Sequence, residues 1–201
     1  MTPAEQYGTA SSDAETPDAA LLVRVANGDR LAARELIDRL GPRLLRHIAR
    51  MLGDRAEAED IVQETFLRLW KIAPNWRQGE AKVSTWAFRV AINLTTDRLR
   101  TRRATVDIDS IAEPESDLES AVSRMTRAGR LAALDAALAT LPERQRQAIS
   151  LRHIEEMANV EIAEIMDISV EAVESLTARG KRALAAALKG QKEALGFNDE
   201  Y

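Results

Sequence analysis

The stretch from Ser84 to Arg103, STWAFRVAINLTTDRLRTRR, combines two helical periodicities, and this combination limits what the chain can fold into. At 3.6 residues per turn, one side consists of Trp86, Val90, Leu94 and, a turn later, Arg98. A second set recurs at helical spacings on another side and consists of Arg89, Asn93, Thr96, Arg100 and Arg103. The stretch therefore predicts a helix that packs through one side and contacts a partner through the other.

The second side suits nucleic acid, both by its chemistry and by the distribution of charge along the chain. Guanidinium groups, amides and hydroxyls match phosphate oxygens and base edges. The net charge is −4, yet residues 76–103 contain seven basic and two acidic side chains. Residues 104–119 then contain six acidic side chains and no Lys or Arg. Because the distribution of charge along the chain matters more than the net charge, we predict a nucleic-acid partner for the basic segment.

Composition favours an all-α chain and excludes several kinds of site. With 45% hydrophobic and 30% charged residues, nine Gly and six Pro, the chain favours helix. The absence of cysteine excludes disulfides and thiolate metal sites. His47 and His153 lack ligand-spaced partners, so we expect no metal or cofactor and interpret both as helix residues, His47 as a partly exposed one. No apolar run approaches the roughly 20 residues of a membrane span, so we expect a cytoplasmic protein without membrane insertion.

Changes in composition along the chain predict two small helical domains joined by a flexible acidic linker. The expected segments are a disordered tail at 1–17, a first domain at 18–103, the linker at 104–119, a second domain at 120–189 and a tail at 190–201. The linker is acidic, contains Pro114 and has few large apolar residues, which is typical of a flexible tether.

The first domain is predicted to contain three helices before the one at Ser84. Asp18 caps a short helix through about residue 27, and a longer helix follows at about 31–52 with a kink or brief break at Gly41-Pro42. Asp54 caps the third. Its apolar side consists of Ile61, Val62, Thr65, Phe66, Leu69 and Trp70. The opposite side holds Glu57, Asp60, Gln63, Glu64, Leu67, Arg68 and Lys71, which periodicity alone interprets as solvated surface.

A loop at residues 73–80 separates this helix from the basic one, and Trp76 is its conspicuous member. An aromatic side chain here covers the edge of the core or stacks on an unpaired base, and the sequence leaves both interpretations open.

The second domain contains a helix-turn-helix spacing. Helices are expected at 159–166 and 169–189 with only Asp167 and Ile168 between them. The inward side is formed by Ile162, Ala163, Ile165, Ile168, Val173, Leu176, Gly180 and Leu184. The outward side of the second helix holds Ala172, Ser175, Arg179 and Arg182, where a recognition helix meets a major groove. A plain helical corner has the same pattern, so DNA binding is a hypothesis at this point.

Taken together, these segments resemble the bacterial sigma factors of the extracytoplasmic-function group, within the sigma-70 family. The resemblance is carried by DRAEAEDIVQETFLRLWK, the loop, VSTWAFRVAINLTTDRLRTRR, the acidic linker and LPERQRQAISLRHIEEMANVEIAEIMDISVEAVESLTARGKRAL. It covers about residues 18–188, with two dissimilar motifs in the family's order and separation. It implies a first domain that binds the RNA polymerase core and the minus-ten promoter element, and a second that binds the minus-thirty-five element.

The resemblance also implies a role for particular positions. Contact with the largest polymerase subunit is implied for Asp60, Gln63, Glu64 and Arg68. Contact with the minus-ten element, including a base flipped from the non-template strand, is implied for Trp76, Arg77, Lys82, Arg89, Asn93, Thr96, Arg100 and Arg103. Contact with the minus-thirty-five element is expected for Ala172, Ser175, Arg179, Lys181 and Arg182. Holding an unpaired base and its phosphates offsets an unstacking cost of a few kcal/mol.

This chain departs from the family in its second domain. Asp167 occupies a turn position where the family usually has Gly, and Glu171 and Glu174 add charge that repels phosphates. Contact with the upstream element is therefore expected to concentrate towards Arg179, Lys181 and Arg182.

The resemblance further implies a protein that is not an enzyme by itself, acts in a stress response and is held by an anti-sigma factor. Two alternatives are a helix-turn-helix regulator that dimerises through its first domain, and an adaptor that binds sigma regulators without initiating transcription.

Overall fold

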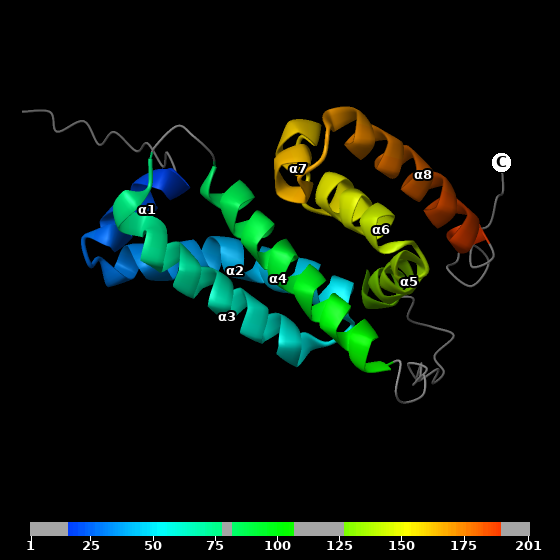
Figure 1. The fold of residues 1–201 in the computed structure, drawn as a ribbon, viewed down its shortest axis with the longest axis horizontal. Coiled ribbons are helices and arrows are strands. Elements are labelled where there is room, and N and C mark those ends of the chain that lie inside the picture. Colours follow the sequence, from blue (N-terminus) through cyan, green and yellow to red (C-terminus); the bar gives the residue numbers. More distant parts are fainter. Residues whose placement is uncertain (1–15, 78–81, 107–126, 190–201) are drawn as a thin grey trace, which may run out of the picture.

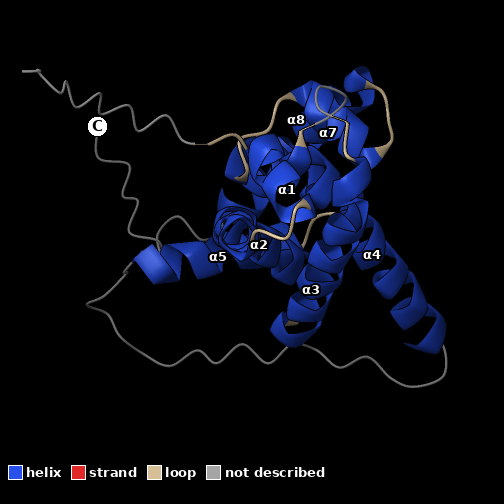
Figure 2. Cartoon of the chain, turned by 90° about the vertical axis from the view of Figure 1, so that its left-hand side faces the viewer, coloured by secondary structure: helices blue, strands red, loops and turns tan. Residues whose placement is uncertain are grey.

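The computed structural model describes residues 16–77, 82–106 and 127–189, and all regular structure in these ranges is helical (Figures 1 and 2). The first domain contains α1 (Asp18–Ala26), α2 (Arg30–Leu52), α3 (Arg55–Ile72), a 3-10 turn (Ala73–Asn75) and α4 (Val83–Val106). The second contains α5 (Arg127–Ala139), α6 (Glu143–Ile149), a π turn (Ser150–Ile154), α7 (Asn159–Met166) and α8 (Val170–Lys189). The all-α prediction is confirmed. None of these helices is long and apolar enough to cross a membrane.

Several predicted segments lie outside the described residues. They are nearly all of the tail at 1–17, the linker from residue 107, the start of the second domain and the tail at 190–201. Helix α4 continues through residues 104–106 to Val106, into the first residues of the predicted linker. The remaining domain limits stay predictions.

Local capping explains where the first helices begin. Asp29 accepts hydrogen bonds from the backbone N–H groups of Leu31 and Ala32, at 2.9 and 3.2 Å, and Asp54 accepts one from Glu57 at 3.1 Å. The predicted cap at Asp18 is wrong, because Asp18 is already the first residue of α1 and pairs with Arg39. The start of α1 is thus held by a contact with α2.

The predicted kink or break at Gly41-Pro42 does not interrupt α2, which runs through both residues. Proline removes one backbone hydrogen bond from a helix interior. Leu36, Leu40, Leu44 and Ile48 flank it and are at most 2% exposed. Burial of this apolar stripe holds the helix together across Pro42.

The packed face of α4 differs from the predicted one. Its buried residues are Val83, Thr85, Ala87, Phe88, Ala91, Ile92 and Thr95. Trp86, Val90 and Leu94 are only partly buried, because Leu94 lies near one edge of this arc and Val90 and Trp86 lie beyond it. The centre of the arc is set by α2, α3 and α7, against which α4 packs. Periodicity therefore identified two sides of α4 but placed the apolar one about a quarter turn away from its centre.

The second domain contains the predicted helix-turn-helix. Asp167 adopts the left-handed conformation expected for it, with φ 53°, and Ser169 accepts a hydrogen bond from the N–H of Ala172 at 3.2 Å. Gly180 permits a close approach, since a Cβ there would lie 2.7 Å from Cγ1 of Ile149. This packing fixes α8 against α6 and leaves its opposite side exposed.

The two domains are packed against each other, as Figure 1 shows for α7 and α4. Helices α5 and α6 contact α2. Leu151, Met157, Ile162 and Ile165 of the second domain belong to the same buried cluster as Phe88 of the first. The helical domains predicted from the sequence thus share a continuous apolar core.

Candidate nucleic-acid and polymerase interface

The predicted contact residues of α4 form a row on its outward side. Arg89, Asn93 and Arg100 are exposed, Thr96 is partly buried, and their spacing places all four within a narrow arc opposite the buried face. We call these four residues the α4 row. Arg100 lies near Asp97 at 3.4 Å, an exposed pair of little energetic weight. The predicted Arg103 lies in α4, but its side chain is outside the described residues.

The three predicted contact residues in the loop before α4 differ in exposure and in the contacts they make. Lys82 is aligned with the α4 row, seven residues before Arg89, and its Nζ lies 2.8 Å from Oε1 of Glu161 in α7. Hydrogen bonding to Glu161 raises the pKa of Lys82. Trp76 is partly buried and meets Trp86 edge-on at 6.4 Å, so it covers the edge of the core in this structure. Arg77 is exposed at the start of the loop.

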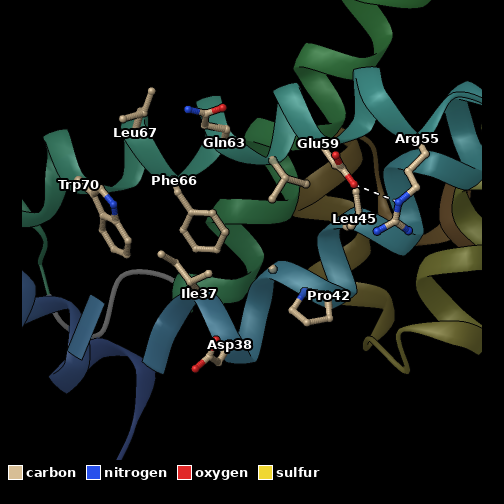
Figure 3. Close-up of a pocket in the computed structure, with 12 residues that line it drawn as sticks. Ile37, Asp38, Pro42, Leu45, Arg55, Glu59, Gln63, Phe66, Leu67 and Trp70 are labelled. Carbon is tan, nitrogen blue, oxygen red and sulfur yellow. Dashed lines mark ion pairs between the residues drawn. The ribbon is translucent and has the colours of Figure 1, made fainter. Parts of the chain in front are cut away.

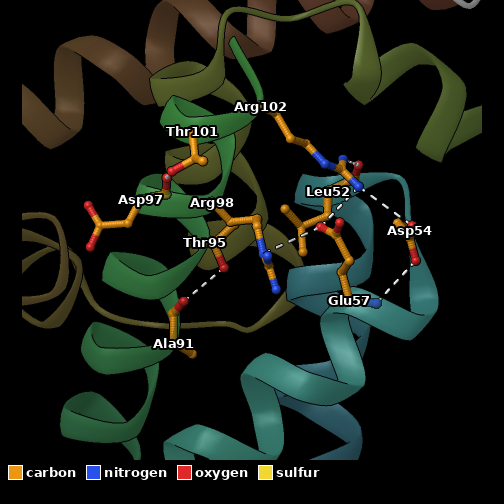
Figure 4. A network of polar contacts seen from close by, with 9 residues as sticks. All are labelled: Leu52, Asp54, Glu57, Ala91, Thr95, Asp97, Arg98, Thr101 and Arg102. Atoms are coloured by element: carbon orange, nitrogen blue, oxygen red, sulfur yellow. Dashed lines mark hydrogen bonds and ion pairs between the residues drawn. The ribbon is translucent and has the colours of Figure 1, made fainter. Parts of the chain in front are cut away.

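Two further basic residues of α4 have a structural role, as Figure 4 shows. Arg102 lies 2.9 Å from Oε2 of Glu57 and donates to the carbonyl of Leu52 at 3.1 Å. Arg98 lies 3.8 Å from the same Glu57 oxygen. These contacts tie the C-terminal half of α4 to the start of α3. The basic segment is therefore divided between arginines that hold the helix and those that face outward.

The predicted polymerase-contact residues lie along α3. Asp60, Gln63 and Arg68 are exposed and Glu64 is partly buried. Nε of Arg68 pairs with Oε1 of Glu64 at 2.7 Å. Asp60 and Glu64 line a hollow of about 360 Å³ between α3 and α4, whereas Gln63 faces the other side, towards α2. The predicted contact residues are therefore close in sequence but lie on two different sides of α3.

The outward side of α8 carries only part of its predicted set. Ser175, Arg179 and Arg182 are exposed and Ala172 is partly exposed, and their spacing places them on one side, which we call the α8 row. Lys181 lies on a different side, near His153, whose pKa is lowered by partial burial and by the charges of Lys181 and Arg152. Glu171 is exposed at the first turn, and backbone and Ser169 hydrogen bonds lower its pKa. A carboxylate thus stays ionised where DNA phosphates would approach.

Each of the two domains matches a known protein family model. Residues 36–105 match the family model Sigma-70 region 2, and residues 131–184 match Sigma-70, region 4. The ECF RNA polymerase sigma factor SigW of Bacillus subtilis is 30% identical over 177 residues, which cover 83% of this chain and 94% of that protein. The chain belongs to the sigma-70 family. It is a sigma factor of the extracytoplasmic-function group.

Other relatives agree with this assignment. The RNA polymerase sigma-H factor of Pseudomonas aeruginosa is 32% identical to this sigma factor over 182 residues, covering 86% of this chain and 94% of that protein. The solved structure of CnrH in complex with the cytosolic domain of CnrY is similar with a TM-score of 0.65 and 25% identity. The matched region covers 86% of this chain and 97% of the chain in that solved structure.

The sequence did not predict the apolar groove that this sigma factor has between α2 and α3, shown in Figure 3. The groove has a volume of about 690 Å³ and is lined by Ile37, Asp38, Gly41, Pro42, Leu45, Arg55, Glu59, Val62, Gln63, Phe66, Leu67 and Trp70. Ile37 is 42% exposed and Leu67 55% exposed, although both are large and apolar. Leu67 could have indicated the groove from the sequence, because it is the apolar residue on the otherwise polar side of α3.

His47 was predicted as a partly exposed helix residue, and this is wrong. It is fully buried, its Nδ1 lies 3.2 Å from Oγ of Ser150, and its ring meets Phe88 at 5.6 Å. Burial, with the charges of Arg50 and Arg146, lowers the pKa of His47 to about 3. Its partner in the second domain is distant in sequence, so helical periodicity gave no indication that His47 would be buried.

In the described residues, no group of three or more potential ligands is placed to hold a metal ion.

Proposed function

We propose that this sigma factor directs core RNA polymerase to promoters and opens the DNA through the α4 row, with α8 contacting the upstream element. The observation that carries the proposal is the α4 row itself, in which Arg89, Asn93, Thr96 and Arg100 project opposite the buried face. Arginine can hold the flanking phosphates while the amide of Asn93 reaches a base edge. Binding energy from such contacts offsets the few kcal/mol needed to unstack a base.

Contact with the polymerase is proposed for α3 and the α2–α3 groove. The groove offers an apolar floor beside the polar side chains of Gln63 and Glu59, which suits a partner helix with one apolar side. Asp60 and Glu64 lie on the other flank of α3, where they can meet basic residues of the same partner. The match of the first domain to region 2 favours this role over dimerisation of a helix-turn-helix regulator.

Action in the cytoplasm and control by an anti-sigma factor are part of the proposal. Its support is the family, together with the solved structure in which the related CnrH is bound to the cytosolic domain of CnrY. The protein is proposed to have no catalytic activity of its own, and to confer promoter choice on the polymerase that carries out synthesis.

An in vitro run-off assay tests the proposal. Purified protein with core polymerase is expected to give a transcript from a double-stranded promoter. Asn93→Ala and Arg100→Ala should each reduce open-complex formation roughly tenfold while core binding is unchanged, since a base or phosphate contact contributes about 1–3 kcal/mol. Arg34→Ala, at an exposed position of α2, is the control. Normal permanganate reactivity in both α4 variants would contradict the assignment of the α4 row.

Core binding is tested separately with Glu64→Lys. This change reverses the charge beside Arg68 and is expected to weaken binding to core polymerase by about tenfold in a titration. Glu164→Lys, on α7, is the control. Unchanged affinity of Glu64→Lys would remove α3 from the interface. Intact core binding with no transcript on any genomic template would favour the adaptor alternative.

A further inference from the structure

The outward side of α8 has an acidic residue at one end and a basic residue further along. Glu171, Ser175, Ala178 and Arg182 are exposed and recur at spacings of four, three and four residues, so they form one line along the helix. We call these four residues the α8 stripe. It shares Ser175 and Arg182 with the α8 row, and it adds Glu171, to which the proposed function gives no role.

The α8 stripe lies opposite the packed side of the helix. At 3.6 residues per turn, its centre is diametrically opposed to Val173 and Gly180, which are buried. Gly180 approaches Ile149 so closely that a Cβ would lie 2.7 Å from Cγ1 of that side chain. This packing fixes the rotation of α8 about its own axis. Glu171 is therefore held at the centre of the surface that a recognition helix presents to DNA.

The length of the α8 stripe decides which end meets the bases. Glu171 and Arg182 are about 16 Å apart along the helix axis, whereas the major groove is about 12 Å wide. One end therefore faces base edges while the other reaches the phosphates at the rim. Phosphates attract the guanidinium of Arg182 and repel the carboxylate of Glu171, so the favoured placement puts Glu171 over the bases. Helix-turn-helix proteins have the same polarity, because the N-terminal residues of their recognition helix contact base edges.

The carboxylate of Glu171 is ionised and held by local hydrogen bonds. Its own backbone N–H and the hydroxyl of Ser169 donate to it and lower the pKa of Glu171. The oxygen of Ser169 in turn accepts a hydrogen bond from the N–H of Ala172 at 3.2 Å. An ionised carboxylate has about four acceptor sites, so Glu171 keeps acceptors for a further donor.

Cytosine is the base whose major-groove edge suits such an acceptor. It presents the N4 amino group, which donates a hydrogen bond. Guanine presents the acceptors N7 and O6 and thymine presents O4, all of which a carboxylate disfavours. Adenine presents its N6 donor beside the N7 acceptor, which opposes the same carboxylate. The hydroxyl of Ser175 can donate or accept, so it imposes no comparable choice.

Glu174 differs from Glu171 in its position on the helix. It is also exposed, but it lies about 60° around the helix from Glu171, on the flank of the α8 stripe. The flank of a helix in the major groove faces the phosphate backbone. Glu174 is therefore expected to repel phosphates whatever the base sequence, whereas Glu171 acts on a single base pair. The two carboxylates make a matched pair for an experiment.

We propose that Glu171 is a specificity-determining residue of the upstream contact, where it accepts a hydrogen bond from N4 of a cytosine and so selects a C·G pair at one position. The inference rests on the proposed function, because it supposes that α8 contacts an upstream element through the major groove. It goes beyond that function by naming a base and the residue that selects it. Repulsion of phosphates, by contrast, would weaken binding to every sequence equally.

Selection from a library of random duplexes tests the inference. The full-length protein, alone and with core polymerase, is used to select from duplexes randomised over about one helical turn. Cytosine is expected to be enriched at one position. Fluorescence anisotropy is then measured on four duplexes that differ only at that position, where the C·G pair should be favoured by about fivefold or more. This ratio should not change as salt rises, although every Kd increases, because a base contact releases no counterion.

Three variants separate base selection from general repulsion. Glu171→Gln should move the preference at that position from cytosine to adenine, because an amide pairs with both N6 and N7 of adenine. A misfolded protein cannot produce such a new preference. Glu171→Ala should show no preference among the four duplexes. Glu174→Gln is the matched control, and it should keep the preference for cytosine while tightening binding to all four duplexes by the same factor.

The outcomes distinguish this inference from the proposed function. Absence of a cytosine preference in the wild-type protein, or its persistence in Glu171→Ala, overturns the inference. Persistence with uniformly tighter binding would show that Glu171 only repels phosphates. If the wild-type holoenzyme transcribes no template but Glu171 still determines the selected base, the proposed function fails and the inference holds for a helix-turn-helix regulator. Transcription that is indifferent to this base pair leaves the function in place and overturns the inference.

Discussion

Helices α4 and α8 carry the two rows proposed to contact DNA, but their surroundings differ. The α4 row lies opposite a wide buried face, and the same helix uses Arg98 and Arg102 to bind the start of α3. The α8 row begins beside the carboxylates of Glu171 and Glu174, and its helix is held by close packing at Gly180. The difference indicates that the number of basic residues in a helix does not by itself locate a contact surface. The position of those residues relative to the buried face of the helix is needed as well.

The largest expected effect distinguishes the two sides of α4. Phe88→Ala should lower the free energy of unfolding by about 3–5 kcal/mol, because the ring is fully buried between α2 and the second domain. Arg89→Ala, the adjacent exposed residue, should change it by less than about 0.5 kcal/mol while weakening promoter binding. Urea denaturation and DNA titration measure the two effects. Equal losses of stability would show that the α4 row is part of the packing.

The buried side of α4 should also give the protein a pH dependence through His47. The folded pKa is about 3 and the ordinary value 6.5, so the fold favours the neutral ring. Stability from this residue is complete above pH 6.5 and is lost as the pH falls from 6.5 towards 3. At pH 5.5 the loss is about 1.4 kcal/mol relative to pH 7.5.

Thermal unfolding at pH 7.5 and 5.5 measures this dependence. His47→Gln should reduce the dependence on pH, since it removes the titrating ring. His153→Gln should retain most of it, because His153 is exposed. An unchanged pH dependence in His47→Gln would show that another group is responsible.

The packing of α8 is tested by a pair of glycine substitutions with opposite expected signs. Gly180→Ala should destabilise by about 1 kcal/mol, because a clash with the Ile149 side chain, about 1–3 kcal/mol, exceeds the gain in helix propensity. Gly129→Ala in α5, where a Cβ meets nothing within 4 Å, should stabilise by up to about 1 kcal/mol. Denaturation midpoints check both. Stabilisation by Gly180→Ala would show that α8 can move away from α6.

The smallest expected effect concerns the acidic start of α8. Glu174→Gln removes a carboxylate from the DNA-facing end and should tighten binding to the upstream element about two- to fourfold at low salt. The gain should shrink as salt rises. Glu59→Gln on α3 is the control, and fluorescence anisotropy with an upstream duplex is the measurement. A gain independent of salt would point to a cause other than phosphate repulsion.

Local sequence determined the helices and the spacing of the outward rows. Asp29 and Asp54 cap α2 and α3 through contacts within three residues, and Asp167 permits the left-handed turn before α8. These features depend on neighbours along the chain, so periodicity and capping rules are sufficient to predict them. The exposed side of α4 was predictable for the same reason.

Tertiary structure decided which face of each helix is central and what the charged residues do. Trp86 and Leu94 are only partly buried, whereas Phe88 is fully buried, because α2 and the second domain pack against the side of α4 that carries Phe88. His47 is buried by a contact with Ser150, and Arg43 is paired with Glu155 112 residues away. Such contacts depend on how the two domains are placed in space, and helical periodicity contains no information about that placement. The free energy of a buried charge is set by the partner it meets there.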